Sequence, residues 1–333
     1  MAASKTFTVI GAGSWGTALA LLLARNQHKV LLWTREESHR LTMQAARENT
    51  KYLPGNPFPE SLQLTNDLTL ALKQSDHVLV CVPSHAFRDI LLSIHTYITP
   101  SMGLVWATKG LDPETGQFLD QVARGILPDN TPFALLTGPS FAKEVAKQQP
   151  TIVTLASDNM AFIESLQDYF QTPYFRTYLC DDIKGAELGG AVKNILAIAV
   201  GIAEGLGYGT NTKAGLMTRG LAEMMRLGTA IGADKETLMG LSGLGDLILT
   251  CSDMQSRNLR FGVAIGKGKS FDETYHEIGQ VVEGVQTTAS ICKLAEHYKV
   301  DMPITKLMYA VLYQNLPAKE AVNLLLSRET GLE

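Results

Sequence analysis

The sequence predicts an α/β domain with a doubly wound, mostly parallel sheet, followed by an all-helical domain. The chain has 333 residues, more than a single hydrophobic core usually serves. Short apolar runs alternate with helical patterns up to residue 182, and from there only helical patterns follow. A glycine-rich turn also joins the first apolar run directly to a helical segment. We therefore expect two domains, residues 1–182 and 183–333.

Strands of the first domain are expected where apolar runs are continuous rather than alternating. Such runs indicate burial on both faces, as in a parallel sheet covered by helices. Ligands of such sheets bind beyond the carboxyl ends of the strands. The expected strands are 7–10, 30–33, 77–82, 103–108, 133–138, 151–156 and 175–179.

The second domain is expected to begin with a long helix near Lys184 and to contain no strand. Its most apolar helical stretch, 195–203, is too short to cross a bilayer, so we expect no stable membrane insertion. The expected helical segments are 186–206, 214–232, 235–241, 256–266, 284–298 and 317–328.

Composition gives no support for nucleic acid or an acidic membrane surface as a partner. Hydrophobic residues make up 45% of the chain, charged residues 19%, and the net charge is −4. Four widely spaced cysteines predict buried, reduced thiols rather than disulfides or a metal site. The N-terminus runs almost directly into the first strand, so we expect no signal peptide and a cytoplasmic protein.

The glycine-rich turn at residues 11–16 predicts a dinucleotide site in a Rossmann-like domain. Gly11 would allow the tight turn, Gly13 would let the backbone approach a pyrophosphate, and Gly16 would let helix and strand pack closely. The N-terminus of the following helix offers free N–H groups to phosphate oxygens. A plain strand-to-helix turn without a ligand is the alternative.

The end of the second strand favours NADP(H) over NAD(H). Sites selective for NAD place an acidic residue there, on the ribose 2′-hydroxyl. Here Thr34 occupies that place and Arg35 follows, and a guanidinium suits a 2′-phosphate. Glu36 and Glu37 keep NAD(H) possible, because a shift of one residue would restore an acidic partner. A solvated surface charge is the alternative for Arg35.

Two further strand-end loops offer groups to a substrate. Lys109, in WATKGL, can point its ammonium into the cleft beyond the sheet. Gly138 and Ser140, in TGPSFAKE, follow another strand, and Pro139 suits the first turn of a helix. The Ser140 hydroxyl and free N–H groups would then face the same cleft. Ordinary loop chemistry is the alternative for both loops.

Lys193 is the expected catalytic residue. It lies in a segment that is otherwise almost wholly apolar or glycine, and lysine is rarely buried unless it is paired or functional. Desolvation would lower its pKa, so that it could exchange a proton near neutrality. The alternative is a side chain that extends to solvent, against which the adjacent Asn194 and the glycines Gly189 and Gly190 argue.

Asp246 and a polar triplet complete the candidates. Glycines place Asp246 at an expected helix start, with Thr250 one turn later on the same face. An N-cap is the alternative role for Asp246. The triplet combines a hydroxyl, a guanidinium and an amide, a set that suits phosphate, although its arginine could instead form a surface salt bridge. Its members are Ser256, Arg257 and Asn258.

Taken together, these segments resemble the bacterial NAD(P)-dependent glycerol-3-phosphate dehydrogenase family. The matching segments occur in family order over most of the chain: GAGSWGTALA, NTKYLPG, CVPSHAFR, WATKGL, TGPSFAKE, AVKNILAIAVGIAEGLG, GLGDLILTC, SRN and VVEGVQT. The resemblance implies reversible oxidoreduction of sn-glycerol 3-phosphate and dihydroxyacetone phosphate, which supplies phospholipid synthesis. It also implies a helical domain of the 6-phosphogluconate-dehydrogenase type and, by analogy, a homodimer.

Residue roles follow from the same resemblance, and no metal is expected. Lys193 matches the proton-transferring lysine of the family and a substrate contact. The other matched substrate contacts are Lys109, Gly138, Ser140, Asp246, Ser256, Arg257 and Asn258. The matched coenzyme contacts are Ser14, Trp15, Arg35, Lys109, Ala142, Arg257, Val281 and Glu283, with Tyr52 as a weaker candidate.

Two other functions would fit a similar architecture. A two-domain dehydrogenase acting on 6-phosphogluconate or ketopantoate would share the fold, but the GLGD and SRN segments argue against it. A non-catalytic dinucleotide sensor would be expected to have lost part of the constellation, whereas Lys109, Lys193 and Asp246 are all present.

Overall fold

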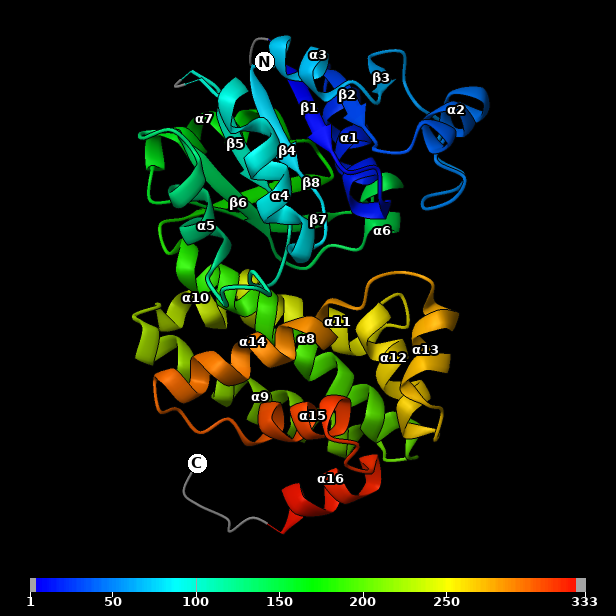
Figure 1. The fold of residues 1–333 in the computed structure, drawn as a ribbon, viewed down its shortest axis with the longest axis vertical. Coiled ribbons are helices and arrows are strands. Elements are labelled where there is room, and N and C mark those ends of the chain that lie inside the picture. Colours follow the sequence, from blue (N-terminus) through cyan, green and yellow to red (C-terminus); the bar gives the residue numbers. More distant parts are fainter. Residues whose placement is uncertain (1–3, 100, 328–333) are drawn as a thin grey trace.

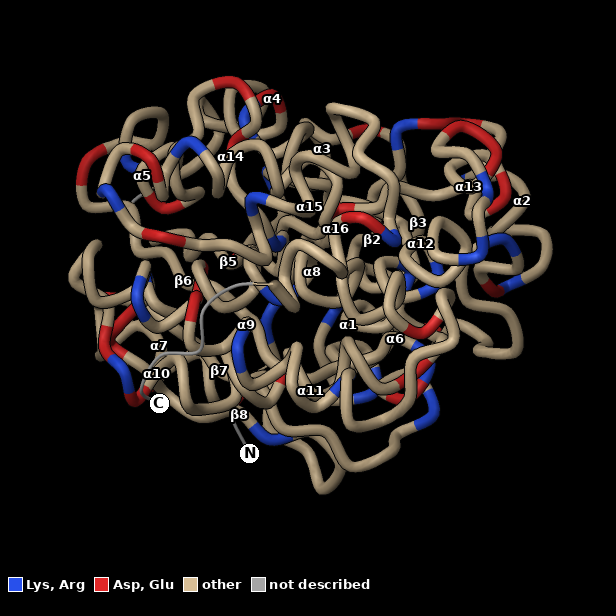
Figure 2. Tube along the Cα trace, turned by 90° about the horizontal axis from the view of Figure 1, so that it is seen from below, with Lys and Arg blue, Asp and Glu red and all other residues tan. Residues whose placement is uncertain are grey.

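The computed structural model describes residues 4–99 and 101–327 and has two halves (Figure 1). The sheet half, residues 6–180, occupies the upper part of the view, and the helical half, residues 183–326, the lower part. Acidic and basic residues are interspersed along the traced chain (Figure 2). All four cysteines are free; Cys251 is buried, as predicted, whereas the other three are only half-buried.

Eight strands of the described chain form one sheet in the order β3-β2-β1-β4-β5-β6-β7-β8. Every neighbouring pair is parallel except β6–β7, which confirms the predicted mostly parallel sheet. The first six strands follow the order of a doubly wound dinucleotide-binding sheet. Their bounds are β1 Thr6–Ile10, β2 Lys29–Trp33, β3 Leu62–Thr65, β4 His77–Val80, β5 Gly103–Trp106, β6 Phe133–Thr137, β7 Thr151–Ala156 and β8 Phe175–Cys180.

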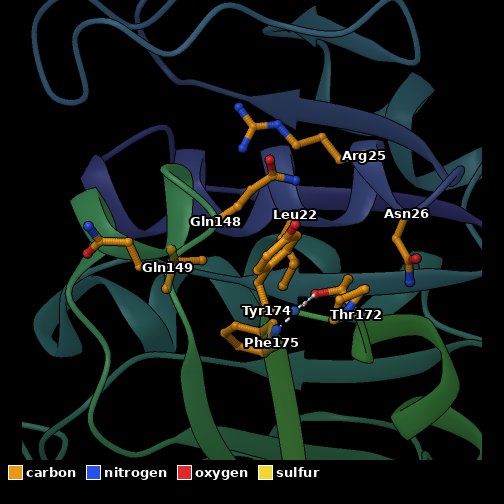
Figure 3. A pocket seen from close by; sticks show the side chains of 10 residues that line it. Leu22, Arg25, Asn26, Gln148, Gln149, Thr172, Tyr174 and Phe175 are labelled. Atoms are coloured by element: carbon orange, nitrogen blue, oxygen red, sulfur yellow. Dashed lines mark hydrogen bonds between the residues drawn. The ribbon is translucent and has the colours of Figure 1, made fainter.

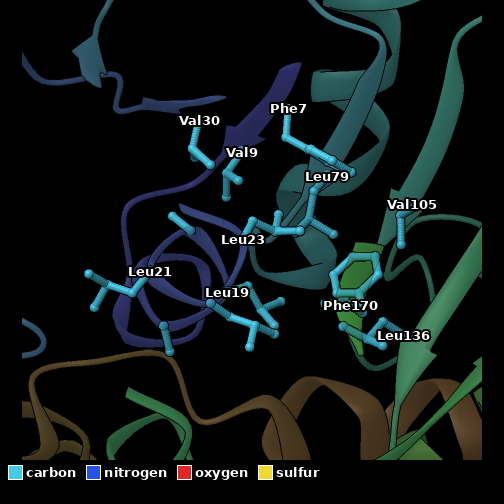
Figure 4. Close-up of a cluster of buried hydrophobic side chains, with 14 of the residues drawn as sticks. Phe7, Val9, Leu19, Leu21, Leu23, Val30, Leu79, Val105, Leu136 and Phe170 are labelled. Atoms are coloured by element: carbon cyan, nitrogen blue, oxygen red, sulfur yellow. The ribbon is translucent and has the colours of Figure 1, made fainter. Parts of the chain in front are cut away.

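Helices cover both faces of this sheet because its strands are apolar on both sides. In β1, Phe7 and Val9 belong to the core beneath α1 and α7, whereas Ile10 belongs to the opposite core beneath α4 and α5. Figure 4 shows the first core, where β1, α1 and the neighbouring strands meet. The helices of this half are α1 Ser14–Arg25, α2 Glu37–Ala46, α3 Leu68–Lys73, α4 Ser84–Ile94, α5 Leu119–Ile126, α6 Ala142–Ala146 and α7 Met160–Phe170, with a 3₁₀ turn at His95–Tyr97.

The helical half contains no strand within residues 183–327, as predicted. Two of its helices, α13 and α15, are absent from the prediction, although a Ser270–Glu273 capping box and Pro303 at the first turn mark their starts. The helices are α8 Ile183–Gly205, α9 Thr210–Ile231, α10 Lys235–Met239, α11 Asp246–Ser252, α12 Arg257–Gly266, α13 Phe271–Ile278, α14 Glu283–His297, α15 Pro303–Tyr313 and α16 Ala318–Leu326. A π-helical turn, Leu241–Gly245, precedes α11.

Helix α8 is apolar well beyond the stretch 195–203, which was expected to be too short to cross a bilayer. Its 23 residues are long and apolar enough to cross a membrane, so that expectation was wrong on length. The reason is that Gly189, Gly190 and Ala191 continue the helix without adding polarity. The apolar window of α8 is entirely buried inside the protein, which identifies it as the core helix of this half.

Glycines bring α8 and α12 into backbone contact. A Cβ on Gly201 would lie 2.3 Å from the Leu259 carbonyl oxygen, and a Cβ on Gly262 would lie 2.2 Å from that of Ile198. One turn further on, Gly205 and Gly266 repeat the arrangement, so the two helices run in the same direction. This packing fixes the N-terminus of α12 beside the middle of α8, next to Lys193 and Asn194.

Candidate active site between the sheet and helical halves

The three glycines after β1 have three different surroundings. Gly11 has a positive φ of 114°, and a Cβ on it would lie 2.5 Å from the Cys81 carbonyl oxygen at the end of β4. A Cβ on Gly16 would lie 1.9 Å from the Gly11 oxygen, so α1 packs directly on the turn. No atom lies within 4 Å of a Cβ built on Gly13. The turn is therefore closed on two sides and open at Gly13, which fits the approach of a pyrophosphate.

The segment after α2 forms a wall beside this turn. Ser14 Oγ donates a hydrogen bond to the Tyr52 carbonyl oxygen at 2.8 Å. Trp15 is half-buried against the core of the sheet half, and its buried Nε1 has no hydrogen-bond partner among the described residues. The Tyr52 ring meets His39 at 5.3 Å between centroids. Both predicted contacts, Ser14 and Tyr52, thus lie together at the mouth of the turn.

The end of β2 presents one unpaired cation. Thr34 is buried directly after the strand, while Arg35 and Glu36 are exposed. Arg40 donates to both carboxylate oxygens of Glu37, at 2.5 and 2.9 Å, and this pairing lowers the pKa of Glu37. Among the described residues, Arg35 has no ion pair, so its guanidinium is available to an anion.

Asp246 joins two lysines from different parts of the chain. Lys193 Nζ on α8 donates to Asp246 Oδ1 at 2.6 Å, and Lys109 Nζ, from the loop after β5, donates to Oδ2 at 2.6 Å. The Asp246 side chain is 1% exposed and that of Lys193 8%. The N-cap of α11 is Gly245, so Asp246 does not have the alternative N-cap role. The structure thus assembles the predicted Lys109, Lys193 and Asp246 into one buried cluster.

Thr250 completes the surroundings of the Lys193 ammonium. Its Oγ1 accepts a hydrogen bond from Lys193 Nζ at 2.8 Å and donates to the Asp246 backbone oxygen at 2.6 Å. An ammonium has three N–H donors. Asp246 and Thr250 use two of them, which leaves one donor for a ligand.

Burial and pairing set the protonation of this cluster. Burial lowers the pKa of Lys193 to about 8, although Asp246 opposes the shift and Lys109 adds to it. Burial disfavours the Asp246 carboxylate, but the ammonium groups of Lys109 and Lys193 outweigh burial and hold its pKa below the usual value. With both lysines protonated the cluster carries one net positive charge, which suits an anionic substrate and a developing oxyanion.

Glycines on α8 make this cluster possible. A Cβ on Gly189 would lie 2.4 Å from the Ser242 carbonyl oxygen, so the π-helical turn can press against α8 and deliver Asp246 to Lys193. Gly190 faces Thr137 at the end of β6 and the Lys109 side chain, at 3.3 and 3.7 Å from a built Cβ. Single π turns inside helices occur often at functional sites, where they redirect a side chain.

The loop after β6 lies against the same cluster. Gly138 has a positive φ of 123°, and its carbonyl oxygen accepts hydrogen bonds from Lys109 Nζ at 3.1 Å and from Ser140 Oγ at 3.0 Å. Ser140 and Ala142 are half-buried at the start of α6. Gly138 and Ser140 are therefore next to Lys109, whereas Ala142 packs against the core of the sheet half.

The predicted phosphate triplet begins α12, and all three of its members already have internal hydrogen bonds. Ser256 is the N-cap and accepts from Leu259 N at 3.2 Å. Asn258 donates to Asn194 Oδ1 at 2.8 Å and accepts from Gly284 N at 3.0 Å, so it ties three helices together. Arg257 Nη1 donates to the Val281 carbonyl oxygen at 2.8 Å. Burial lowers the pKa of Arg257, and Glu283 opposes that shift.

Glu283 connects the two halves. Its Oε2 accepts from Ser84 Oγ, at the start of α4, at 3.0 Å. Burial raises the pKa of Glu283, against the effects of Ser84 and Arg257. Residues 257, 281 and 283 thus form one group facing the sheet half. The exposed His85 lies close enough to this group to lower the pKa of Glu283.

A surface pocket elsewhere has none of these residues. Its lining comes from the end of α1, the segment after α6 and the start of β8, with Arg25, Gln148 and Tyr174 among the side chains (Figure 3). This pocket is therefore separate from the candidate active site. Within the described residues, no group of three or more His, Cys, Asp or Glu could hold a metal ion. One fully buried polar residue beside the glycine turn, Asn49, was not predicted from the sequence. Only its place in the segment NTKYLPG could have indicated a role.

A doubly wound dinucleotide-binding sheet, joined to a helical half through a Lys109–Asp246–Lys193 cluster at the junction of the two, defines a dinucleotide-dependent dehydrogenase. Comparison with known protein families narrows this class to one family. A family model described as NAD-dependent glycerol-3-phosphate dehydrogenase N-terminus matches residues 6–163, and the corresponding C-terminus model matches residues 182–323. The chain belongs to this family, which confirms the resemblance in its sequence.

Full-length relatives support the same assignment. The chain is 51% identical, over 100% of both chains, to a glycerol-3-phosphate dehydrogenase [NAD(P)+] of Colwellia psychrerythraea. It is 49% identical to the protein of that name from Escherichia coli O17:K52:H18, over 98% of this chain and 96% of the relative. The solved glycerol-3-phosphate dehydrogenase of Coxiella burnetii superposes with a TM-score of 0.94 at 44% identity, covering 98% of this chain and 99% of that chain.

Proposed function

We propose that this chain catalyses the reversible NAD(P)-dependent oxidoreduction of sn-glycerol 3-phosphate and dihydroxyacetone phosphate, and so supplies glycerol 3-phosphate for phospholipid synthesis. The observation that carries the proposal is the Asp246 carboxylate held between Lys109 and Lys193. In this proposal residues 1–182 bind the coenzyme and residues 183–333 bind most of the substrate.

The coenzyme site is proposed at the glycine turn, because Gly13 is open and the first N–H groups of α1 lie beside it. A bound nicotinamide coenzyme supplies or accepts the hydride at the substrate carbon. The residues proposed to hold it are Gly11, Gly13, Ser14, Trp15, Gly16, Arg35, Tyr52, Lys109, Ala142, Arg257, Val281 and Glu283.

Lys193 is proposed as the catalytic residue. As the ketone is reduced, negative charge develops on its oxygen, and the free N–H of the Lys193 ammonium stabilises this charge and then delivers the proton. A pKa of about 8 makes the ammonium and the neutral amine both accessible near neutral pH, so the same group accepts the proton in the reverse direction.

The other groups are proposed to place the substrate. Lys109 adds positive potential near the same oxygen, and Asp246 orients both lysines. The phosphate is held by the polar triplet and the loop after β6, so that binding energy far from the carbonyl positions it for reaction. The proposed substrate residues are Lys109, Gly138, Ser140, Lys193, Asp246, Ser256, Arg257 and Asn258.

The proposed preference is for NADP(H), with NAD(H) as a second coenzyme. It is supported by the unpaired Arg35 beside the end of β2 and by the pairing of Glu37 with Arg40. Replacing Arg35 with Ala should lower the ratio of NADPH to NADH efficiency. A ratio equal to that of the wild type would remove the 2′-phosphate assignment.

The activity is tested by following NADPH and NADH oxidation separately with dihydroxyacetone phosphate. Turnover of this substrate is the expected result. Binding of NADPH without turnover would favour the sensor function, and turnover of ketopantoate alone would favour another dehydrogenase. Arg257→Ala should raise the KM for dihydroxyacetone phosphate more than it lowers kcat, and an unchanged KM would count against a phosphate contact.

The proposed form is a cytoplasmic homodimer without membrane insertion, by analogy with the family. The burial of α8 inside the helical half supports the last point. Light scattering of the purified protein measures the assembly, and a monomer at all concentrations would contradict it.

A further inference from the structure

Asn49 lies beside the glycine turn, 37 residues away from it in sequence, and is fully buried. Its Nδ2 donates to the Ala12 carbonyl oxygen at 2.9 Å and to Thr17 Oγ1 at 2.8 Å. Its Oδ1 accepts from Tyr52 N at 3.2 Å and lies 3.2 Å from His39 Nε2. Both N–H donors and the acceptor oxygen of the amide therefore have hydrogen-bond partners. Because all of these bonds would be lost on rotation, the buried amide has one fixed orientation.

The contact with Ala12 determines where the next N–H group points. In a trans peptide the carbonyl oxygen and the following N–H lie on opposite sides of the bond, and the described residues contain no cis peptide. Because Asn49 holds the Ala12 oxygen on its own side, the Gly13 N–H points to the other side. Gly13 itself is unobstructed, since a Cβ built on it would meet no atom within 4 Å.

The remaining contacts hold Asn49 and the turn together. Thr17 lies in the first turn of α1, so the same amide binds both the turn and the helix that follows it. The Tyr52 backbone is fixed at both ends, through its N–H to Asn49 and through its carbonyl oxygen to Ser14. The segment 49–52 is thereby tied to the glycine turn at two points, Ala12 and Ser14, and to α1 at Thr17.

We propose that Asn49 is a positioning residue for the coenzyme: it presents the Gly13 N–H to the pyrophosphate by holding the Ala12 carbonyl oxygen. This inference rests on the proposed coenzyme site. Asn49 touches neither the reacting atoms nor the lysine cluster, so its loss affects coenzyme affinity and leaves the chemical step intact.

Asn49→Ala, and Asn49→Leu as a variant that keeps the volume, test the proposal against Asn56→Ala. Asn56 is a matched control because it is buried in the same segment but donates only to the Leu53 and Pro54 oxygens. Both Asn49 variants should raise the NADPH Kd and the coenzyme KM about tenfold, as expected for a lost hydrogen bond to a charged group. The kcat at saturating NADPH and the KM for dihydroxyacetone phosphate should stay near wild type.

Two inhibitors separate a pyrophosphate effect from a general loosening. ADP, which contains the pyrophosphate, should lose affinity in both Asn49 variants, whereas 2′-AMP, which lacks it, should keep its affinity. An unchanged NADPH Kd in folded Asn49 variants would overturn the proposal, as would an equal loss in Asn56→Ala or loss of fold in both Asn49 variants. Failure of the wild type to bind NADPH would instead contradict the proposed function.

Discussion

The two halves of this molecule build their parts of the site from different materials. In the sheet half the proposed coenzyme site is mainly backbone, an open glycine turn at the N-terminus of a helix. In the helical half the candidate site is a set of buried ionisable side chains, with Asp246 and Lys193 almost inaccessible to solvent. We therefore expect coenzyme binding at the glycine turn to be sensitive to added atoms, and catalysis at the Asp246–Lys193 pair to be sensitive to altered charge.

Glycine serves both halves in different ways. After β1, Gly13 leaves space for a ligand. Between α8 and α12, Gly201 and Gly262 leave no space at all, since the helix backbones themselves meet there. The same residue type therefore opens one surface and closes another, and substitution by alanine distinguishes the two uses.

The largest effect is expected from removing the charge at Lys193. Lys193→Ala should lower kcat by at least about 10³-fold, because it removes both the proton donor and the group that stabilises the oxyanion. The NADPH Kd should stay near wild type, since the glycine turn is in the other half. Steady-state turnover and fluorescence titration with NADPH measure the two quantities.

Lys184→Ala is the matched control for that variant. Lys184 lies on the same helix but donates to the Ile231 carbonyl oxygen, away from Asp246. Its turnover should stay within a few-fold of wild type. Near-normal turnover in Lys193→Ala would contradict the assignment of the proton transfer to a side chain of the helical half.

The next largest effect concerns the sheet half, where a buried titratable group is kept neutral. Burial lowers the pKa of His77 to about 4, and its Nδ1 has no partner among the described residues. In the unfolded chain His77 takes up a proton near pH 6.5, whereas in the folded protein it does so only near pH 4. His77 therefore does not reduce the unfolding free energy above pH 6.5, but reduces it progressively as the pH falls towards 4. A pKa of about 4 in the folded protein corresponds to a loss of about 3 kcal/mol in unfolding free energy at low pH.

Urea unfolding at several pH values between about 4 and 7 measures this dependence. His77→Phe suits the surrounding rings of Phe7 and Tyr169 and should flatten the curve, leaving the smaller contribution of His28, whose pKa burial also lowers. An equally steep curve in His77→Phe would assign the acid sensitivity to other groups.

The sequence predicts these two halves unequally well. Continuous apolar strands and the glycine turn are local signals, and they located seven of the eight described strands. Strand β3 was missed because LQLT is short, mixes polar with apolar residues and lies at the sheet edge. Local patterns were sufficient wherever burial on both faces left only apolar residues.

The charged cluster was harder to predict from local patterns. Lys193 stands out in an apolar helix, but Asp246 follows it by 53 residues and Lys109 precedes Asp246 by 137. Only tertiary structure shows that one carboxylate bridges both lysines. The bounds expected for α8, 186–206, are close to the observed ones, but the length of its apolar stretch was underestimated, because glycine looks like an interruption in sequence yet here permits helix contact.

A third effect should appear where helix backbones meet. Gly262→Ala places a Cβ 2.2 Å from the Ile198 oxygen, so α8 and α12 must separate. We expect a loss of about 2 kcal/mol in unfolding free energy, in the range for overpacked cores. We also expect a higher KM for dihydroxyacetone phosphate, because Arg257 moves with α12. Gly215→Ala in α9, where nothing lies within 4 Å, should be neutral or stabilising and serves as the control.

The smallest effect is expected at the open glycine, and it separates binding from folding. Gly13→Ala adds a Cβ that meets no atom within 4 Å, and the φ of −77° at this position suits alanine. The melting temperature should therefore match that of the wild type. The NADPH Kd should rise about tenfold, equivalent to about 1.4 kcal/mol in binding free energy, because the methyl group occupies the space that the pyrophosphate needs. Gly125→Ala on α5, equally free of neighbours, should change neither quantity. If Gly13→Ala lowered the melting temperature and left the NADPH Kd unchanged, the open side of the turn would not be a ligand site. The sheet half would then not bind the coenzyme through the backbone of this turn.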